Sequence, residues 1–203
     1  MIKRHYFGMI PFMAGLILIA SLAGCTNVNN DNGDEEPLLY EVGDTGPGGG
    51  KIFYKSVAGF TMTDTNKKAH YLEAAPADMV STLAWASASH TGTNIAGTGT
   101  AIGSGRKNTT LILAIDTTAP AAKACDVYVN GGKDDWFLPS KDELNQLYVH
   151  SALFSNLSPD TYWSSSQDNE NTYMAWYQFF ATGGQGNDGS KNTASPVRAI
   201  RAF

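Results

Sequence analysis

The chain changes character at residue 38, and this change decides which residues are able to build a folded core. Residues 26–37 contain one aliphatic side chain among asparagines and acids, so they bury too little apolar surface to order themselves and indicate a flexible tether. From Leu38 to Phe203, aromatic and aliphatic residues recur throughout. About 165 residues are enough for one domain with a sizeable core. We therefore expect a single domain over residues 38–203.

The segment ahead of the tether has the three parts of a secretory signal peptide. Lys3 and Arg4 form a basic head, an almost uncharged apolar run covers residues 6–20, and small residues precede Cys25. The quartet Leu-Ala-Gly-Cys at residues 22–25 resembles the bacterial lipobox. In that class of signal the cysteine is lipidated and becomes the first residue of the mature protein.

The resemblance to a lipobox sets the expected organisation and location of the protein. It implies a lipoprotein signal peptide over residues 1–24, followed by a lipidated cysteine and its flexible tether over residues 25–37. An ordinary signal peptide and an uncleaved membrane anchor are the alternatives, although the apolar run is short for a span of about 20 residues. Thr26, in place of aspartate, resembles the sorting signal of outer-membrane lipoproteins. We expect a cell-envelope protein, anchored to a membrane by its N-terminal lipid, at the outer membrane or cell surface.

The charge of the mature chain argues against nucleic acid as a partner. Loss of Lys3 and Arg4 with the signal peptide lowers the 14 basic residues to 12 against 19 acidic ones, which makes the net charge −7. Such a surface repels phosphate and sulfate backbones. With Cys25 lipidated, Cys125 has no partner for an intramolecular disulfide, so the core has to hold the fold. Among apolar neighbours, Cys125 fits a buried small side chain better than a dimer-forming or reactive thiol.

Local patterns predict short helices and strands throughout the domain. A capping box formed by Ser140 and Glu143 predicts a helix that begins after Ser140. Other helices are expected over 108–115 and 119–129, strands over 51–54, 70–75, 162–166, 174–182 and 196–203, glycine-rich turns over 43–50 and 183–189, and a surface excursion over 86–105. Arg198 and Arg201 differ in parity on the last strand, so at most one faces solvent and the other pairs with a buried acid. Helices first and an antiparallel sheet later predict an α+β domain.

Four landmarks in the second half of the chain occur in an order typical of one family. They are Asp-Trp-Phe-Leu-Pro-Ser-Lys-Asp-Glu-Leu at 135–144, Tyr-Trp-Ser-Ser-Ser at 162–166, Ala-Trp at 175–176 and Val-Arg-Ala-Ile-Arg-Ala-Phe at 197–203. Together they resemble the domain family named after the C-terminal domain of the Legionella collagen-like adhesin. Residues 43–49 and 71–76 are similar to long-form members, so the resemblance covers about residues 40–203.

This family resemblance implies an extracellular, often lipid-anchored domain with a C-type-lectin-like or related α+β fold. The namesake is an adhesin whose terminal domain forms trimers and recognises sulfated glycosaminoglycans, so a homotrimer is one assembly that the resemblance implies. Its ligand is not carried over, because the namesake depends on basic residues and this mature chain is acidic. Glycines at 43, 46 and 49 are also too few triplets for a collagen-like stalk.

Aromatic residues crowd the C-terminal part of the chain beside polar loops, an arrangement that suits a sugar-binding surface. Alternate side chains of a strand face opposite sides, so Trp176 and Gln178 would share one face and Tyr177 the other. Trp163 and Trp176 are expected in the core. The candidate ligand-binding residues are Asp168, Asn169, Tyr177, Gln178, Asn187 and Asp188.

Patterns for catalysis and for metal binding are weak by comparison. The glycine-rich stretches lack residues that a phosphate loop or a dinucleotide fingerprint requires. His70, His90 and His150 are isolated and have neither the spacing of a zinc site nor the context of a nucleophile. We therefore expect no enzyme and no cofactor. The oxygen-rich loop at 167–171 leaves calcium open as a ligand.

Two functions of different class follow from these observations. The first is a surface-anchored lipoprotein that acts as a non-catalytic binding module, or adhesin, for an extracellular carbohydrate or matrix ligand. The alternative is a diversified display lipoprotein that binds protein ligands through its C-terminal sheet and loops. An envelope-structural protein without a soluble ligand is the third hypothesis.

Overall fold

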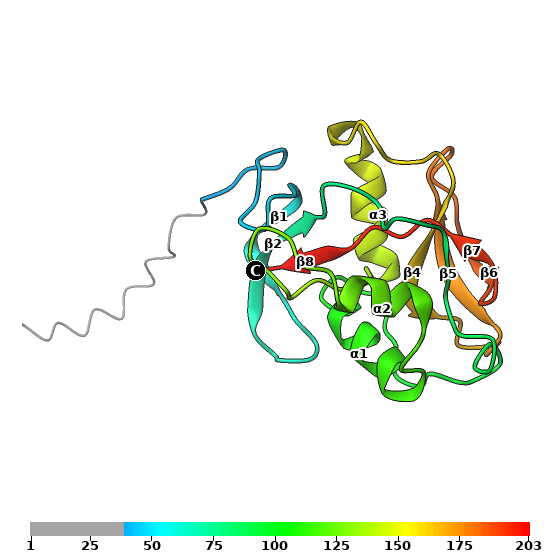
Figure 1. Ribbon diagram of the computed structural model, residues 1–203. Coiled ribbons are helices and arrows are strands. Elements are labelled where there is room, and N and C mark those ends of the chain that lie inside the picture. Colours follow the sequence, from blue (N-terminus) through cyan, green and yellow to red (C-terminus); the bar gives the residue numbers. More distant parts are fainter. Residues whose placement is uncertain (1–38) are drawn as a thin grey trace, which may run out of the picture. The chain divides into compact units, whose positions relative to one another are not determined.

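The computed structural model describes residues 39–203, which form an α+β fold as expected (Figure 1). In chain order its elements are β1 (Lys51–Thr61), β2 (Lys68–Ala74), β3 (Leu83–Ala84), α1 (Gly105–Ile115), α2 (Pro120–Asp126), α3 (Lys141–Val149), the 3-10 helix η1 (Ser151–Leu153), β4 (Thr161–Gln167), β5 (Met174–Phe179), β6 (Gln185–Ser190), β7 (Ala194–Ser195) and β8 (Ile200–Ala202). The predicted signal peptide, the lipidated Cys25 and the tether up to residue 37 lie outside the described residues. Within the described chain, none of the helices has the length and apolar character that a membrane crossing requires.

The first sheet joins the two ends of the described chain. Its strands lie in the order β1-β2-β8, and both pairs are antiparallel. Glu73 on the central strand lies opposite Arg201, so the last residues of the chain complete a sheet that begins before the helices. The expectation that the helices come first is therefore wrong for this sheet. Local patterns mark each strand, but they do not identify a partner 128 residues away along the chain.

The second sheet has the order β4-β5-β6, and helix α3 lies between it and the first sheet (Figure 1). The turn predicted over residues 183–189 is wrong, because residues 185–190 form strand β6 and pair with β5. Gly183 and Gly184 do lie in the chain reversal between β5 and β6, whereas Gly186 and Gly189 serve close packing. A Cβ atom on Gly189 would lie 2.6 Å from the ring of Trp163, so glycine is what allows the ring to lie there.

The strand predicted over residues 196–203 is confirmed only at its end. There β8 pairs with β2, while the short β7 before it pairs with β3. Between them, Val197 and Ala199 are fully buried, and their carbonyl groups accept from Met79 N and Ala75 N at 2.9 Å each. This stretch crosses between the sheets and bonds to a loop, so it is extended without being a regular strand.

Both arginines of this last segment are buried, which agrees with the expectation that at most one faces solvent. Arg198 is fully buried and donates from Nε to Asp78 Oδ1 at 2.6 Å. Arg201 binds Glu73 at 3.1 Å and Asp135 at 2.7 Å. Burial alone would raise the pKa of Asp135, but the hydrogen bonds and charge of Arg201 outweigh it and lower that pKa. Strand parity does not set the direction of the Arg198 side chain, because the chain there is not a regular strand.

Two groups of buried apolar residues fill the domain. The first lies around α1 and α2, and its largest members are Trp85, Trp136 and Trp163. Cys125 belongs to this group and is fully buried, as predicted, and burial raises the pKa of its thiol. The second group packs the sheet β1-β2-β8 against α3, with Phe53 and Leu144 among its members. The Cys125 thiol of the first group is protonated and enclosed, so it contributes to packing and is not a nucleophile.

Helix α3 begins at the predicted capping box. Ser140 Oγ accepts from Glu143 N at 3.4 Å, and Glu143 Oε2 accepts from Ser140 N at 2.7 Å. The fully buried Glu143 also accepts from Gly103 N at 2.8 Å, in the loop before α1. Burial raises the pKa of Glu143 to about 7, although the backbone donors oppose the shift. One carboxylate therefore fixes the start of α3 and the approach to α1 together.

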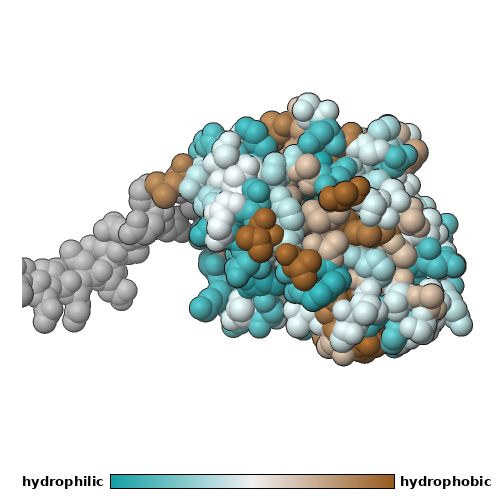
Figure 2. Space-filling model, in the orientation of Figure 1, coloured by the Kyte–Doolittle hydropathy of each residue, from teal (hydrophilic) through white to brown (hydrophobic). Residues whose placement is uncertain are grey.

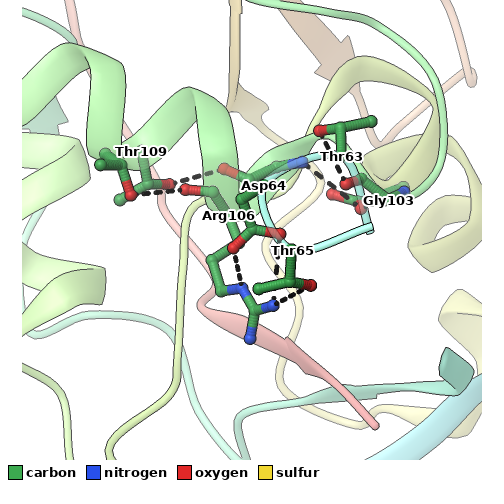
Figure 3. Close-up of polar contacts among 9 residues, drawn as sticks. Thr63, Asp64, Thr65, Gly103, Arg106 and Thr109 are labelled. Atoms are coloured by element: carbon green, nitrogen blue, oxygen red, sulfur yellow. Dashed lines mark hydrogen bonds and ion pairs between the residues drawn. The ribbon is translucent and has the colours of Figure 1, made fainter. Parts of the chain in front are cut away.

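The start of α1 is also tied to the turn between β1 and β2, as Figure 3 shows. Arg106 donates from Nε and Nη2 to the two carboxylate oxygens of Asp64 at 2.6 and 3.2 Å. Beside this pair, Thr63 N donates to Gly103 O at 2.9 Å. Burial alone would raise the pKa of Asp64, but the bonds and charge of Arg106 outweigh it and lower that pKa. The first sheet is thereby fastened to the helical part of the domain.

Candidate functional site

A cleft of about 630 Å³ opens where the sheet β4-β5-β6 meets the short sheet β3-β7. Two aromatic residues on neighbouring strands, Trp163 and Tyr177, are cross-strand partners and both line it. Trp163 is buried, as expected, and its Nε1 donates to Leu83 O at 3.1 Å and Thr193 O at 3.2 Å. The residues that line the cleft are Thr82, Asp160, Thr161, Trp163, Tyr177, Asp188, Gly189, Ser190, Thr193, Ala194, Ser195 and Pro196.

Two glycines of β6 let the Tyr177 ring lie close against that strand. A Cβ atom on Gly186 would lie 2.5 Å from Tyr177 Oη, and one on Gly189 would lie 2.8 Å from Tyr177 Cδ1. Both distances are shorter than a carbon atom tolerates, so any larger residue would displace the ring. The orientation of Tyr177 is therefore built into the backbone of β6.

The hydroxyl group of Tyr177 is held by an acid of the same cleft. It donates to Asp188 Oδ1 at 2.9 Å. This hydrogen bond, together with burial and the negative charge of Asp188, raises the pKa of Tyr177 and keeps the phenol neutral. Among the described residues, Asp188 Oδ2 makes no hydrogen bond. The pair therefore presents an aromatic face beside an acceptor that remains available to a ligand.

A second hollow of about 300 Å³ continues the cleft on the other side of Tyr177. Thr161 and Tyr177 line both spaces, and Phe179, Gly184 and Gln185 complete the second one. Phe179 is 38% exposed, so this hollow adds a second aromatic side chain to the surface. We call the two spaces together the Tyr177 groove.

Two other candidate residues, Asp168 on the loop after β4 and Asn187 on β6, are hydrogen-bonded to each other. Asn187 donates to Asp168 Oδ1 at 3.0 Å, which joins the loop after β4 to the exposed strand β6. Asp168 is 7% exposed, and its other oxygen accepts from Asn171 N at 2.9 Å. Asn169 is exposed at the tip of this loop. Asp168 is thus committed to shaping the loop, whereas Asn169 and Asn187 are at the surface.

The structure does not bring Gln178 to this surface. Gln178 is fully buried, and its Nε2 donates to Gly183 O at 2.7 Å. The strand alternation placed it correctly on the face opposite Tyr177, but that face is covered by α3. Trp176 on the same face is half-buried rather than core, and Lys141 Nζ lies 4.9 Å from its ring centroid.

Sequence reasoning missed the residues that close the Tyr177 groove from the side. Asp160 and Thr161 stand just ahead of the predicted strand at 162–166, and residues 193–196 come from the β7 turn. The sequence does point to Asp160, because an acidic residue directly ahead of a strand rich in aromatic residues is a candidate for ligand binding. Nothing in the sequence of β7 indicates that it lines the groove, because its position is set by pairing with the distant strand β3.

The whole Tyr177 groove lies inside the part of the chain that a known family matches. The Lcl C-terminal domain family matches residues 74–201, which is more than half of the 203 residues. The chain belongs to the Lcl C-terminal domain family. This confirms the resemblance drawn from the four sequence landmarks and supports an adhesin-like surface domain. No curated protein sequence matches the chain.

A serine, a histidine and an acid also meet in this Lcl C-terminal domain, away from the groove. Ser87 Oγ lies 2.9 Å and Asp116 Oδ1 3.6 Å from the same ring nitrogen of His90, Nδ1. A nucleophilic triad uses the two ring nitrogens separately, one toward the serine and one toward the acid. In residues 39–203, no three histidine, cysteine, aspartate or glutamate side chains gather as a metal site would require. The arrangement at His90 is that of a hydrogen-bonded loop.

The face of the Lcl C-terminal domain drawn in Figure 2 is mostly hydrophilic or neutral. Its hydrophobic residues lie in separate small groups rather than in one continuous area. An extended hydrophobic patch would indicate a protein or membrane interface, and this face does not present one.

Proposed function

We propose that this Lcl C-terminal domain is a non-catalytic binding module that takes an extracellular saccharide in the Tyr177 groove. The observation that carries the proposal is the pairing of an aromatic side chain with carboxylates and hydroxyl groups in one cleft. Sugar rings place their apolar C–H faces on aromatic rings, while their hydroxyl groups need acceptors and donors at the edge. Tyr177 supplies the aromatic ring, and Asp188 and Thr161 supply hydrogen-bonding groups for the sugar hydroxyls.

The size and rigidity of the groove support this proposal. A volume of about 630 Å³ falls in the range of small-molecule sites. The Tyr177 ring is fixed by the glycines of β6 and by its bond to Asp188, so little conformational freedom would be lost on binding. A preorganised site favours binding of a saccharide, because less conformational entropy is lost when the complex forms.

The proposal includes a non-catalytic role and an extracellular position. Asp160 and Asp188 are both exposed, whereas an acid that protonates a glycosidic oxygen is typically held in an apolar, buried setting. The signal sequence before Cys25 supports export and attachment to the cell envelope through an N-terminal lipid. An anchored binding domain of this kind would act as an adhesin.

A glycan and matrix-component array tests the proposal. The full-length chain in detergent is applied with calcium and again with chelator. We expect specific saccharide signals that fall at least tenfold in Tyr177→Ala, a loss of about 1.4 kcal/mol or more of binding free energy. Tyr173→Ala, which truncates an exposed tyrosine outside the groove, is the matched control. A blank array in both conditions contradicts the proposal, and loss of the signals on chelation would show that saccharide binding requires a divalent cation.

A further inference from the structure

The Tyr177 groove carries negative charge on both sides of its aromatic ring. Tyr177 lies on the central strand β5, with Asp188 on β6 at one side and Asp160 just before β4 at the other. Both carboxylates accept only from neutral hydroxyl groups among the described residues, Asp188 from Tyr177 and Asp160 from Ser158. Neither acid is paired with a cation there.

The basic residues on the neighbouring elements are turned away from the groove. Lys191 directly follows β6, but it is fully buried and donates from Nζ to Thr93 O and Gln167 Oε1. Lys141 lies by Trp176 on the opposite face of the sheet and pairs with Asp142. Arg198, close in sequence to β7, is bound to an acid in the interior. The lining of both hollows contains no lysine, arginine or histidine.

From this charge distribution we infer that the groove selects saccharides that carry free amino groups over sulfated saccharides. The inference rests on the function proposed above. A protonated sugar amine placed over the Tyr177 ring gains a cation–π contact, and Asp188 Oδ2 is beside it as a charge-assisted acceptor. A sulfate would enter a cleft that is lined by Asp160 and Asp188 and by no lysine, arginine or histidine.

Binding of matched oligosaccharides to the full-length chain in detergent tests the inference. The probes are tetrasaccharides of β-1,4-linked glucosamine, the same chain fully N-acetylated, and a heparin tetrasaccharide, compared by calorimetry at about pH 5.5, where aspartate is ionised. We expect the free amine to bind about tenfold more tightly than the N-acetylated chain, with heparin weakest. The amine preference should shrink with added salt.

Two charge variants distinguish the effect of charge within the groove from the effect of the protein's net negative charge. Asp188→Asn keeps an acceptor for the Tyr177 hydroxyl, and in this variant the amine and N-acetylated chains should bind with about equal affinity. Asp126→Asn removes the same charge from α2, far along the chain from the groove residues, and should keep the preference.

The remaining outcomes distinguish the inference from the proposed function. Equal affinity for the amine and N-acetylated chains, or tighter heparin binding, overturns the inference and leaves saccharide binding intact. If none of the three probes binds while the array gives signals for other saccharides, the inference is overturned and the proposed function stands, whereas a blank array overturns both. A lysine-rich peptide that binds in their place would assign the acidic groove to a protein partner and overturn both.

Discussion

Lys191 is fully buried and has no carboxylate partner within residues 39–203. Its Nζ donates to Thr93 O at 2.9 Å and to Gln167 Oε1 at 2.7 Å, and lies 4.5 Å from the Trp85 ring centroid. These contacts draw part of the predicted excursion 86–105 into the interior. Burial lowers the pKa of Lys191 to about 8.

This environment predicts an unusual dependence of stability on alkaline pH. Between pH 8 and the ordinary lysine value of 10.5, the unfolded chain binds the Lys191 proton and the folded chain has released it. The free energy of unfolding should therefore rise across this interval, by about 1 kcal/mol or more. Urea titrations at several pH values measure it, with Lys191→Met as the comparison. An identical pH dependence in that variant would show that the rise comes from other groups.

The glycines that support Tyr177 allow a second prediction for single residues. Gly189→Ala places a methyl group 2.6 Å from the Trp163 ring and should lower the free energy of unfolding by about 1–3 kcal/mol. Gly184→Ala is the matched control on the same hairpin, because its nearest atom would be 3.7 Å away. Chemical unfolding of both variants checks the difference. Equal unfolding free energies for the two variants would mean that β6 can shift to make room for the methyl group, and that it does not fix the rings of Trp163 and Tyr177.

Among the elements, helix α3 depends most on a single carboxylate. Glu143 accepts from the amides of Ser140 and Gly103, so Glu143→Gln would point an NH₂ group at one of these donors. At about pH 8, where Glu143 is ionised, we expect a loss of about 1–3 kcal/mol in unfolding free energy. Glu170→Gln, at an exposed loop position, is the control and should change stability little. Unfolding followed by circular dichroism makes the comparison, and equal values would contradict the role given to Glu143.

Elements with local signals were predictable from the sequence, and elements defined by distant pairing were not. The capping box at Ser140 and the strand at 162–166 are set by their own residues, and both are confirmed. Strand β6 was mistaken for a turn because glycine normally marks turns, whereas here it accommodates two rings from other strands. For the site, the aromatic residue and its acid, Tyr177 and Asp188, were predicted, but Asp160 was not.

At the scale of the whole molecule, the fold extends beyond the family match that begins at residue 74. Glu73 accepts from the amides of Gly48 and Gly50 and also pairs with Arg201 near the C-terminus. The glycine-rich turn and β1 are therefore held by the same buried ion pair that closes the first sheet. Residues ahead of the family match therefore pack as part of the same fold.

The proposed anchoring makes a prediction for the entire chain, because the two cysteines have opposite environments. Cys25 stands where a lipid would be attached, while Cys125 is enclosed in the core. In bacteria that express the protein, Cys25→Ser should abolish labelling by an alkyne palmitate analogue. The variant should also no longer be anchored to the membrane through a lipid. Cys125→Ser should keep the label, since a protonated buried thiol is not the acceptor. Labelling that survives Cys25→Ser would refute the lipid anchor, and the Tyr177 groove would then belong to a domain held at the envelope by other means or released from it.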